Sequence, residues 1–140
     1  MIITGKYPQL RLRRNRYHQW SRKLITENNL SVNDLILPIF IIDGKNKKIP
    51  VKTMPGVFRY TLDKLNSVVQ SAIYLGIPMV ALFPYTKGSL KNLLGTESLN
   101  PNNLVCRACK QIKKKFKNKI GIMCDVALDP YTSHGHDGVF

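Results

Sequence analysis

Three solid apolar runs, separated by segments with helical periodicity, constrain the fold of this chain most. The runs cover residues 35–42, 79–83 and 120–128. Each is too short for a buried helix, and a run without alternation is typical of a strand covered on both faces. Between them, apolar residues recur at helical spacing over 61–75 and 101–117, where Thr61 and Asn100 with Pro101 are suitable first residues. This order predicts three adjacent parallel strands, with both helices covering one face of the sheet.

The segment before the first run differs in character from the rest. Residues 1–16 are basic and show no period, which fits an extended arm, and a short helix is expected over 17–28. The chain is therefore divided into an arm with a short helix, 1–30, and three β/α units, 31–140.

Proline, glycine and lysine mark the expected irregular positions. Pro38 has no backbone donor, so the first strand is expected to have a free edge or a bulge. Residues 44–56 are rich in lysine and close with a Pro-Gly turn, and 85–99 contain several glycines and asparagines, so both are expected to be loops.

The charge of the chain favours anionic partners. Lys and Arg number 22 against 8 Asp and Glu, a formal net charge of +14, which attracts phosphate backbones. The basic runs at 11–23, 45–52 and 110–119 match no helix-turn-helix, zinc-finger or RNA-recognition pattern, so no specific nucleic acid is expected. A basic nucleic-acid-binding module nevertheless remains an alternative.

Cysteine usage and hydropathy bear on the compartment. Three cysteines without a signal peptide argue against a disulfide framework and for a reducing compartment. Cys106 and Cys109 form a CxxC inside a predicted helix with no second pair, so they are expected to be structural. No apolar run reaches the roughly 20 residues of a membrane-spanning helix. A cytoplasmic protein without a membrane partner is expected.

Polar residues are densest immediately after the third apolar run. If 120–128 is extended, Asp125, Ala127 and Asp129 share one face of the strand. A carboxylate inside an apolar strand costs several kcal/mol unless it is paired, so Asp125 is expected to have a partner. The following loop carries Ser133, His134, His136 and Asp137 among other polar residues. Active sites of α/β proteins are built at such strand ends, although these residue types are also common turn formers and helix caps.

These residues resemble the porphobilinogen synthase family, also called δ-aminolaevulinate dehydratase. The run DVALDPYTSHGHDG carries the resemblance most specifically. Further stretches are RLRR, LILPIFI, MPGVFRY, GIPMVALFP and NPNNLVCRA, at 11–14, 35–41, 54–60, 76–84 and 100–108. The resemblance implies the N-terminal part of a (β/α)₈ TIM barrel, with about three parallel strands preceded by an extended basic arm that reaches around a neighbouring subunit of a homo-octamer.

The resemblance also implies a reaction. The family is a lyase that condenses two molecules of 5-aminolevulinate into porphobilinogen in tetrapyrrole and heme biosynthesis. It uses two lysines that form Schiff bases with the substrate ketones, and these lie on later strands. No lysine here sits in a matching motif, so the 140 residues alone are expected to be inactive.

Site residues follow from the same resemblance. Asp125 is expected nearest the substrate amino group, and Ser133 and His134 are weaker candidates for orienting roles. Zinc-dependent members carry cysteines where this chain has Ala127, Asp129 and Asp137, so zinc is not expected. Carboxylates at the last two positions, with His136 as a weaker ligand, suit Mg²⁺ or a metal-free site.

Within the family, magnesium can also bind outside the active site, through residues that this chain lacks. A third interpretation of the sequence, besides the synthase and the nucleic-acid-binding module, is a non-catalytic remnant or assembly partner that keeps only the arm and the subunit contacts.

Overall fold

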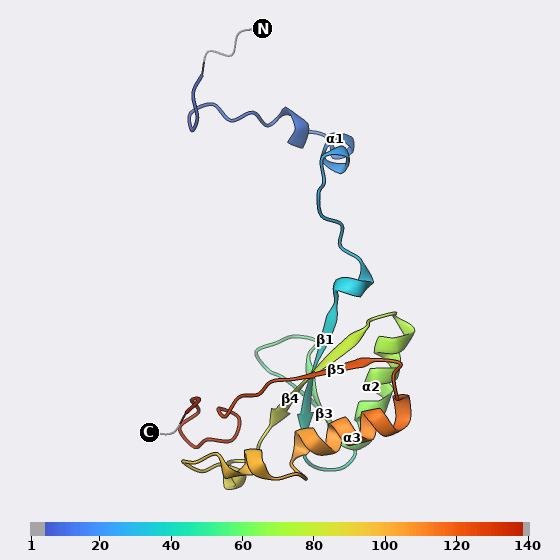
Figure 1. Cartoon of the computed structure of the whole chain (residues 1–140), viewed down its shortest axis with the longest axis vertical. Coiled ribbons are helices and arrows are strands. Elements are labelled where there is room, and N and C mark those ends of the chain that lie inside the picture. Colours follow the sequence, from blue (N-terminus) through green and yellow to red (C-terminus); the bar gives the residue numbers. More distant parts are fainter. Residues whose placement is uncertain (1–4, 139–140) are drawn as a thin grey trace. The chain divides into compact units, whose positions relative to one another are not determined.

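The computed structural model of the chain describes residues 5–138 (Figure 1). The chain folds as two compact units, Met1–Ser31 and Val32–Phe140. The first unit contains a single turn of 3₁₀ helix, Arg14–Arg16, and the six-residue helix α1, Gln19–Leu24. This helix lies inside the predicted range 17–28 but is shorter, because no side chain caps its first turn and its apolar side chains Trp20 and Leu24 remain exposed.

The second unit is built on a five-stranded sheet in the order β2-β3-β1-β4-β5. The strands in chain order are β1 Ile36–Ile42, β2 Lys48–Pro50, β3 Phe58–Thr61, β4 Met79–Tyr85 and β5 Gly121–Cys124. β1 pairs in parallel with β4, and β4 with β5, which confirms the three adjacent parallel strands.

Strands β2 and β3 were not expected, because 44–56 was predicted as a loop and no element was assigned to 57–60. β3 pairs in parallel with β1, and β2 pairs antiparallel with β3. β3 is only four residues long, too short for a periodic signal, and its place is fixed by a partner distant in sequence. On β1 it pairs only with Phe40, Ile41 and Ile42, so this side of β1 is free beside Pro38, as the proline predicts.

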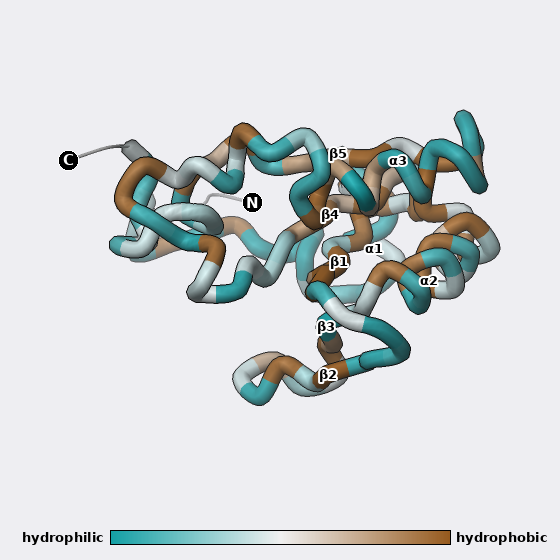
Figure 2. The backbone as a smooth tube through the Cα atoms, turned by 90° about the horizontal axis from the view of Figure 1, so that it is seen from below, coloured by the Kyte–Doolittle hydropathy of each residue, from teal (hydrophilic) through white to brown (hydrophobic). Residues whose placement is uncertain are grey.

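Two helices cover one face of this sheet. They are α2, Leu62–Tyr74, and α3, Leu104–Phe116, and Figure 2 shows both on the same side of the row of strands. Alternate side chains of β1 and β4 pack against them. The core residues include Ile39, Ile41, Val80 and Leu82 from the strands, Leu65, Val69 and Ala72 from α2, and Ala108, Ile112 and Phe116 from α3. Both predicted helices are thereby confirmed.

The helix starts differ from the expected capping. Thr61 precedes α2, but its buried hydroxyl accepts from Lys47 N at 3.0 Å and donates to Lys47 O at 3.2 Å, joining the helix to the hairpin. α3 begins three residues later than predicted, because Asn103, not Asn100, accepts the amide of Cys106 at 2.8 Å. The Asn100 side chain instead accepts the amide of Asn102, which shapes the preceding turn.

β5 ends at Cys124, four residues before the end of the predicted strand. Asp125 and Val126 are exposed, the latter completely, at 101% of its reference area. The prediction that Asp125 is a buried carboxylate within a strand is therefore wrong. The predicted strand was too long because the side chains at 126–128 are apolar and continue the apolar run, although the strand itself ends at Cys124. In residues 5–138, no helix is long and apolar enough to cross a membrane.

Candidate functional site

A cleft of about 520 Å³ opens at the carboxyl ends of the parallel strands. β1 contributes Phe40, β3 contributes Arg59, and β4 contributes Phe83 and Tyr85. The rings of Phe40 and Phe83 lie 5.8 Å apart at their centroids and form an apolar wall. Parallel strands bring their carboxyl ends to the same edge of the sheet, so residues from four separate parts of the chain meet here.

Two of the predicted site residues, Asp125 and Asp129, line this cleft together. Both follow β5, and both are exposed. They share the cleft because the chain bends after Cys124, and not because they alternate along a strand. A cleft with two solvated carboxylates on one wall can bind an ammonium group.

The loop that carries these carboxylates is fastened to the loop after β4 (Figure 1, red beside yellow). Asn92 N donates to Tyr131 O at 3.3 Å, and Ser133 N donates to Asn92 O at 3.0 Å. Thr132 is fully buried between the loops and donates its hydroxyl to His136 O at 2.9 Å. The two loops thus form one wall of the cleft, held by backbone hydrogen bonds.

Gly95 allows this close contact. Its φ of 59° lies in the left-handed region, which favours glycine, and a Cβ there would be in ordinary van der Waals contact with Thr132 Cγ2 at 3.4 Å.

Asp137 has a structural role that the sequence did not predict. Its Oδ1 accepts the amide of Leu128 at 2.6 Å and the amide of Asp129 at 3.0 Å. One carboxylate thereby closes the loop on itself and fixes the backbone that carries Asp129. The predicted role of Asp137 as a metal ligand stays a prediction.

Ser133, His134 and His136 lie in the same loop but do not line the cleft. The His134 and His136 rings are stacked with centroids 6.1 Å apart, and His136 N donates to His134 Nδ1 at 3.3 Å. Their proposed roles in orienting substrate, or in binding metal for His136, stay predictions. Across residues 5–138, no three His, Cys, Asp or Glu side chains gather as a metal-binding group.

Tyr131 is a cleft residue that was not predicted as a site residue. Burial raises the pKa of its phenol, and the nearby Cys106, Glu97 and Cys124 raise that pKa further. The hydroxyl therefore stays protonated at neutral pH and can donate a hydrogen bond to a substrate oxygen. The only sequence signal was its place inside the polar loop.

Arg59, Tyr85 and Lys91 were missed as well. Arg59 Cζ lies 4.9 Å from the centre of the Tyr85 ring, and Lys91 enters from the loop after β4. Arg59 could have been found only by recognising β3. Arg59 and Lys91 add positive charge to the cleft that also holds the two carboxylates.

The three cysteines are free thiols and are partly buried. Cys109 of α3 approaches Cys124 of β5 with 3.4 Å between the sulfur atoms, and not its CxxC partner Cys106. Burial and then the Cys124 thiol raise the pKa of Cys109 to about 12. A thiol held protonated is a weak nucleophile and ligand, in agreement with the structural role expected for the CxxC.

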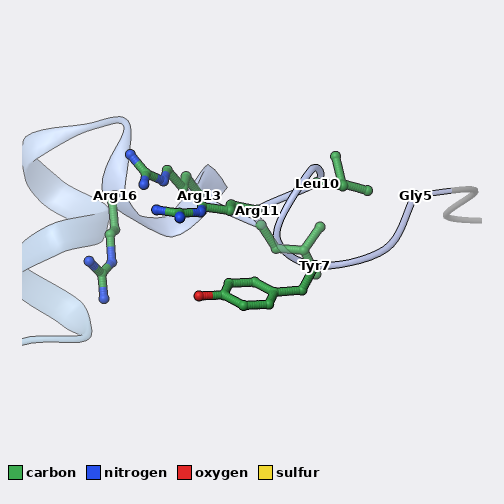
Figure 3. Close-up of a pocket in the computed structure, with 7 residues that line it drawn as sticks. Gly5, Tyr7, Leu10, Arg11, Arg13 and Arg16 are labelled. Atoms are coloured by element: carbon green, nitrogen blue, oxygen red, sulfur yellow. The ribbon is translucent and has the colours of Figure 1, made fainter.

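A separate cavity of about 540 Å³ lies within the arm, and three of its seven lining residues are arginines (Figure 3). Arg11, Arg13 and Arg16 surround it, and the Arg11 Cζ atom lies 5.6 Å from the centre of the Tyr7 ring. Its charge fits an anion, but its open, polar lining holds no group that would select one.

Comparison with known proteins gives relatives that are similar over most of this chain. A family model described as delta-aminolevulinic acid dehydratase matches residues 9–140. The delta-aminolevulinic acid dehydratase of Bradyrhizobium diazoefficiens is 52% identical over 93% of this chain and 36% of the relative. That of Chlamydia pneumoniae is 42% identical over 93% of this chain and 39% of the relative.

A solved structure is similar in fold. It is the delta-aminolevulinic acid dehydratase (porphobilinogen synthase) of Toxoplasma gondii ME49 in complex with the reaction product porphobilinogen. The TM-score is 0.81 at 40% identity, over 94% of this chain and 37% of that one. The open α/β sheet is thus the N-terminal part of a TIM barrel, and the chain spans less than half the length of these relatives. The chain belongs to the delta-aminolevulinic acid dehydratase family.

Proposed function

We propose that the chain provides the aspartate-lined part of the active site of a porphobilinogen synthase, which condenses two molecules of 5-aminolevulinate. The observation that carries this proposal is the cleft at the strand ends, where Asp125 and Asp129 meet in a chain of this family. The substrate has an ammonium group, a ketone and a carboxylate. Two carboxylates in the cleft suit the ammonium group.

The chemical steps divide between this chain and residues outside it. Asp125 pairs with the substrate ammonium, and the protonated Tyr131 donates a hydrogen bond to a carbonyl or carboxylate oxygen at the inner wall. Asp137 orders the loop behind Asp129 without touching substrate. The Schiff-base lysines of the family have no counterpart here, so covalent activation of the ketones depends on later strands.

Three further properties of the complete enzyme are proposed from the family resemblance. They are a cytoplasmic location, assembly into a homo-octamer through the arm, and use of Mg²⁺. Exposed Tyr17, Trp20 and Leu24 in the arm support a role in subunit contacts. Sedimentation of a complete protein with and without residues 1–31, in the presence and absence of Mg²⁺, tests assembly and metal use together.

Complementation tests the activity. The chain alone should make no porphobilinogen from 5-aminolevulinate, and borohydride should trap no imine on it. Mixing it with the complementary C-terminal piece of the Bradyrhizobium relative should restore both, and Asp125→Asn should lower the restored rate by at least about tenfold. Lys113→Gln, on the exposed end of α3, is the matched control and should leave the rate unchanged.

Two results would contradict this division of chemistry. One is turnover by the 140 residues alone, or a borohydride adduct on one of their own lysines. The other is full restored activity in the Asp125→Asn variant.

A further inference from the structure

Cys109 and Cys124 form a pair of thiols that the chemistry of the cleft does not use. Their sulfur atoms lie 3.4 Å apart, although the two residues are 15 positions apart in sequence. The sulfur atoms of a disulfide are about 2.04 Å apart, so these two need to approach each other by only about 1.4 Å. Torsions about the Cα–Cβ bonds of the two residues move sulfur atoms by such distances.

The pair connects a helix with the strand that follows it in the chain. Cys109 lies in α3, and Cys124 is the last residue of β5. Both pack against the hydrophobic core, and both stay partly exposed. Among residues 5–138, β5 has a strand partner on one side only, β4. A bond between the two sulfur atoms would therefore fasten an edge strand to the helix that covers it, immediately before the polar loop begins at Asp125.

The two thiols differ in reactivity. Burial, and after it the hydrogen bond and charge of Cys124, raise the pKa of Cys109 to about 12, so Cys109 attacks an oxidant slowly. Cys124 is therefore the thiol that reacts first with an oxidant. Once Cys124 is oxidised, Cys109 is already within 3.4 Å of the sulfur that it must attack. Such proximity offsets a small thiolate fraction, because the second step takes place within one molecule.

We propose that Cys109 and Cys124 are a reversible redox site, which closes to an intramolecular disulfide when the chain meets a hydroperoxide. First, the Cys124 sulfur attacks one peroxide oxygen, the O–O bond breaks, and the products are a sulfenic acid on Cys124 and an alcohol, or water from hydrogen peroxide. Next, the Cys109 sulfur attacks the Cys124 sulfur. The S–S bond forms, the S–O bond breaks, and the hydroxyl leaves as water with the proton of Cys109.

This redox site is independent of the proposed function, since neither thiol lines the cleft. The two thiols together lose two electrons to one hydroperoxide, and a dithiol reductant returns them. In a reducing compartment both thiols stay free, as they are in this structure. The disulfide is then a response to oxidising conditions, and it joins Cys109 to the strand, not to its CxxC partner Cys106.

Peptide mapping identifies the bond. Trypsin places each cysteine in a different peptide, because it cleaves after Lys91, Arg107, Lys110 and Lys119. The folded chain is treated with one equivalent of hydrogen peroxide, the remaining thiols are alkylated, and the digest is analysed by mass spectrometry. The Cys109–Cys124 bond should exceed each other pairing at least about tenfold. The free thiols should fall from three to one, and dithiothreitol should restore them.

Serine variants and a denatured sample are the controls. Cys106→Ser should leave the yield of the Cys109–Cys124 bond within about twofold, because its thiol takes no part. Cys109→Ser should block the bond and leave Cys124 as a sulfenic acid, which dimedone should label at least about tenfold more than in Cys106→Ser. In concentrated urea the preference for Cys109–Cys124 should vanish, since only the fold brings these sulfur atoms together. The urea comparison uses the unsubstituted chain, so it carries the test if a variant fails to fold.

The stability of the oxidised chain tests whether the bond fits the fold. A disulfide that closes a loop of 15 residues should lower the equilibrium constant of unfolding by about a hundredfold, measured by urea titration with and without dithiothreitol. An oxidised chain that is less stable than the reduced chain would overturn the proposal. So would a predominant Cys106–Cys109 or intermolecular bond in the folded chain, or the same pairing preference in urea as in buffer.

Discussion

Replacing Asp137 by alanine should loosen the loop that carries Asp129 without unfolding the domain. The carboxylate accepts two backbone amides, from Leu128 at 2.6 Å and Asp129 at 3.0 Å. Hydrogen bonds to a charged acceptor contribute about 1.5–3 kcal/mol when buried. Asp137 is exposed, and water can replace it in part, so a total loss of about 1–2 kcal/mol is expected for local closure of the loop.

Hydrogen exchange measures this loss directly. A change of about 1.36 kcal/mol in local opening is about tenfold in exchange rate, so the amides of Leu128 and Asp129 should exchange about 5–30 times faster in Asp137→Ala. Amides of the core strands should keep their rates, because opening of the loop is local. Asp137→Asn keeps one side-chain oxygen in place and should show less than half of the effect in free energy.

The comparison of the two variants separates a structural role from metal binding. If Asp137 acts through a cation, the amides of Leu128 and Asp129 should lose protection in both Asp137→Asn and Asp137→Ala. Adding Mg²⁺ should then protect these two amides only in the unsubstituted chain. If neither variant changes the exchange of Leu128 and Asp129, the hydrogen bonds to Asp137 do not hold this loop.

Four further results are expected. Ile112→Ala, at a fully buried position of α3, should lower the free energy of unfolding by about 2–5 kcal/mol, measured by denaturant titration; a loss below about 1 kcal/mol would contradict the core described above. Because the folded pKa of Cys109 is raised from 9.0 to about 12, its contribution to stability is complete below pH 9 and should disappear as the pH rises toward 12; Cys109→Ala should remove this part of the alkaline loss of stability. RNA and DNA should bind weakly, without sequence preference, and with an affinity that falls steeply between about 50 and 200 mM salt in a filter assay, as charge alone dictates; tight sequence-dependent binding at physiological salt would favour the nucleic-acid-binding alternative. Dialysed chain should hold no stoichiometric zinc by atomic absorption, since Asp129 and Asp137 replace thiolate ligands; one zinc per chain that Asp129→Ala abolishes would show that the zinc-independent assignment is wrong.

The long apolar runs predicted the parallel strands and covering helices because burial on both faces leaves a strong local signal. β1 and β4 are seven residues each, and both helices show a continuous apolar stripe. β3 escaped prediction because its four residues depend on pairing with β1, which local sequence does not reveal. The predicted end of β5 was too late because Val126 is apolar and prolongs the apolar run. In the structure Val126 is fully exposed and lies beyond the strand.

The candidate site was predicted in part. Asp125 and Asp129 line the same cleft, but not through the alternation along a strand that the sequence predicted, because β5 ends at Cys124. Arg59 and Tyr85 were not predicted, since their proximity depends on the β3–β1–β4 order. The polar loop itself was recognised, but its internal use of Asp137 was not, because a carboxylate that accepts backbone amides and one that binds a ligand look alike in sequence.

The uncovered face of the sheet has a consequence for how the protein behaves in concentrated solution. Among residues 5–138, Ile36, Met123 and Tyr85 are 45%, 44% and 55% exposed on strands whose other face is packed by α2 and α3. Contact between such faces of two molecules is attractive, and mutual repulsion between chains of net charge +14 opposes it. Salt shortens the range of that repulsion to about 3 Å at 1 M but leaves the apolar attraction. Colloidal stability of this protein is therefore greatest at low ionic strength, and concentrated salt drives it toward precipitation.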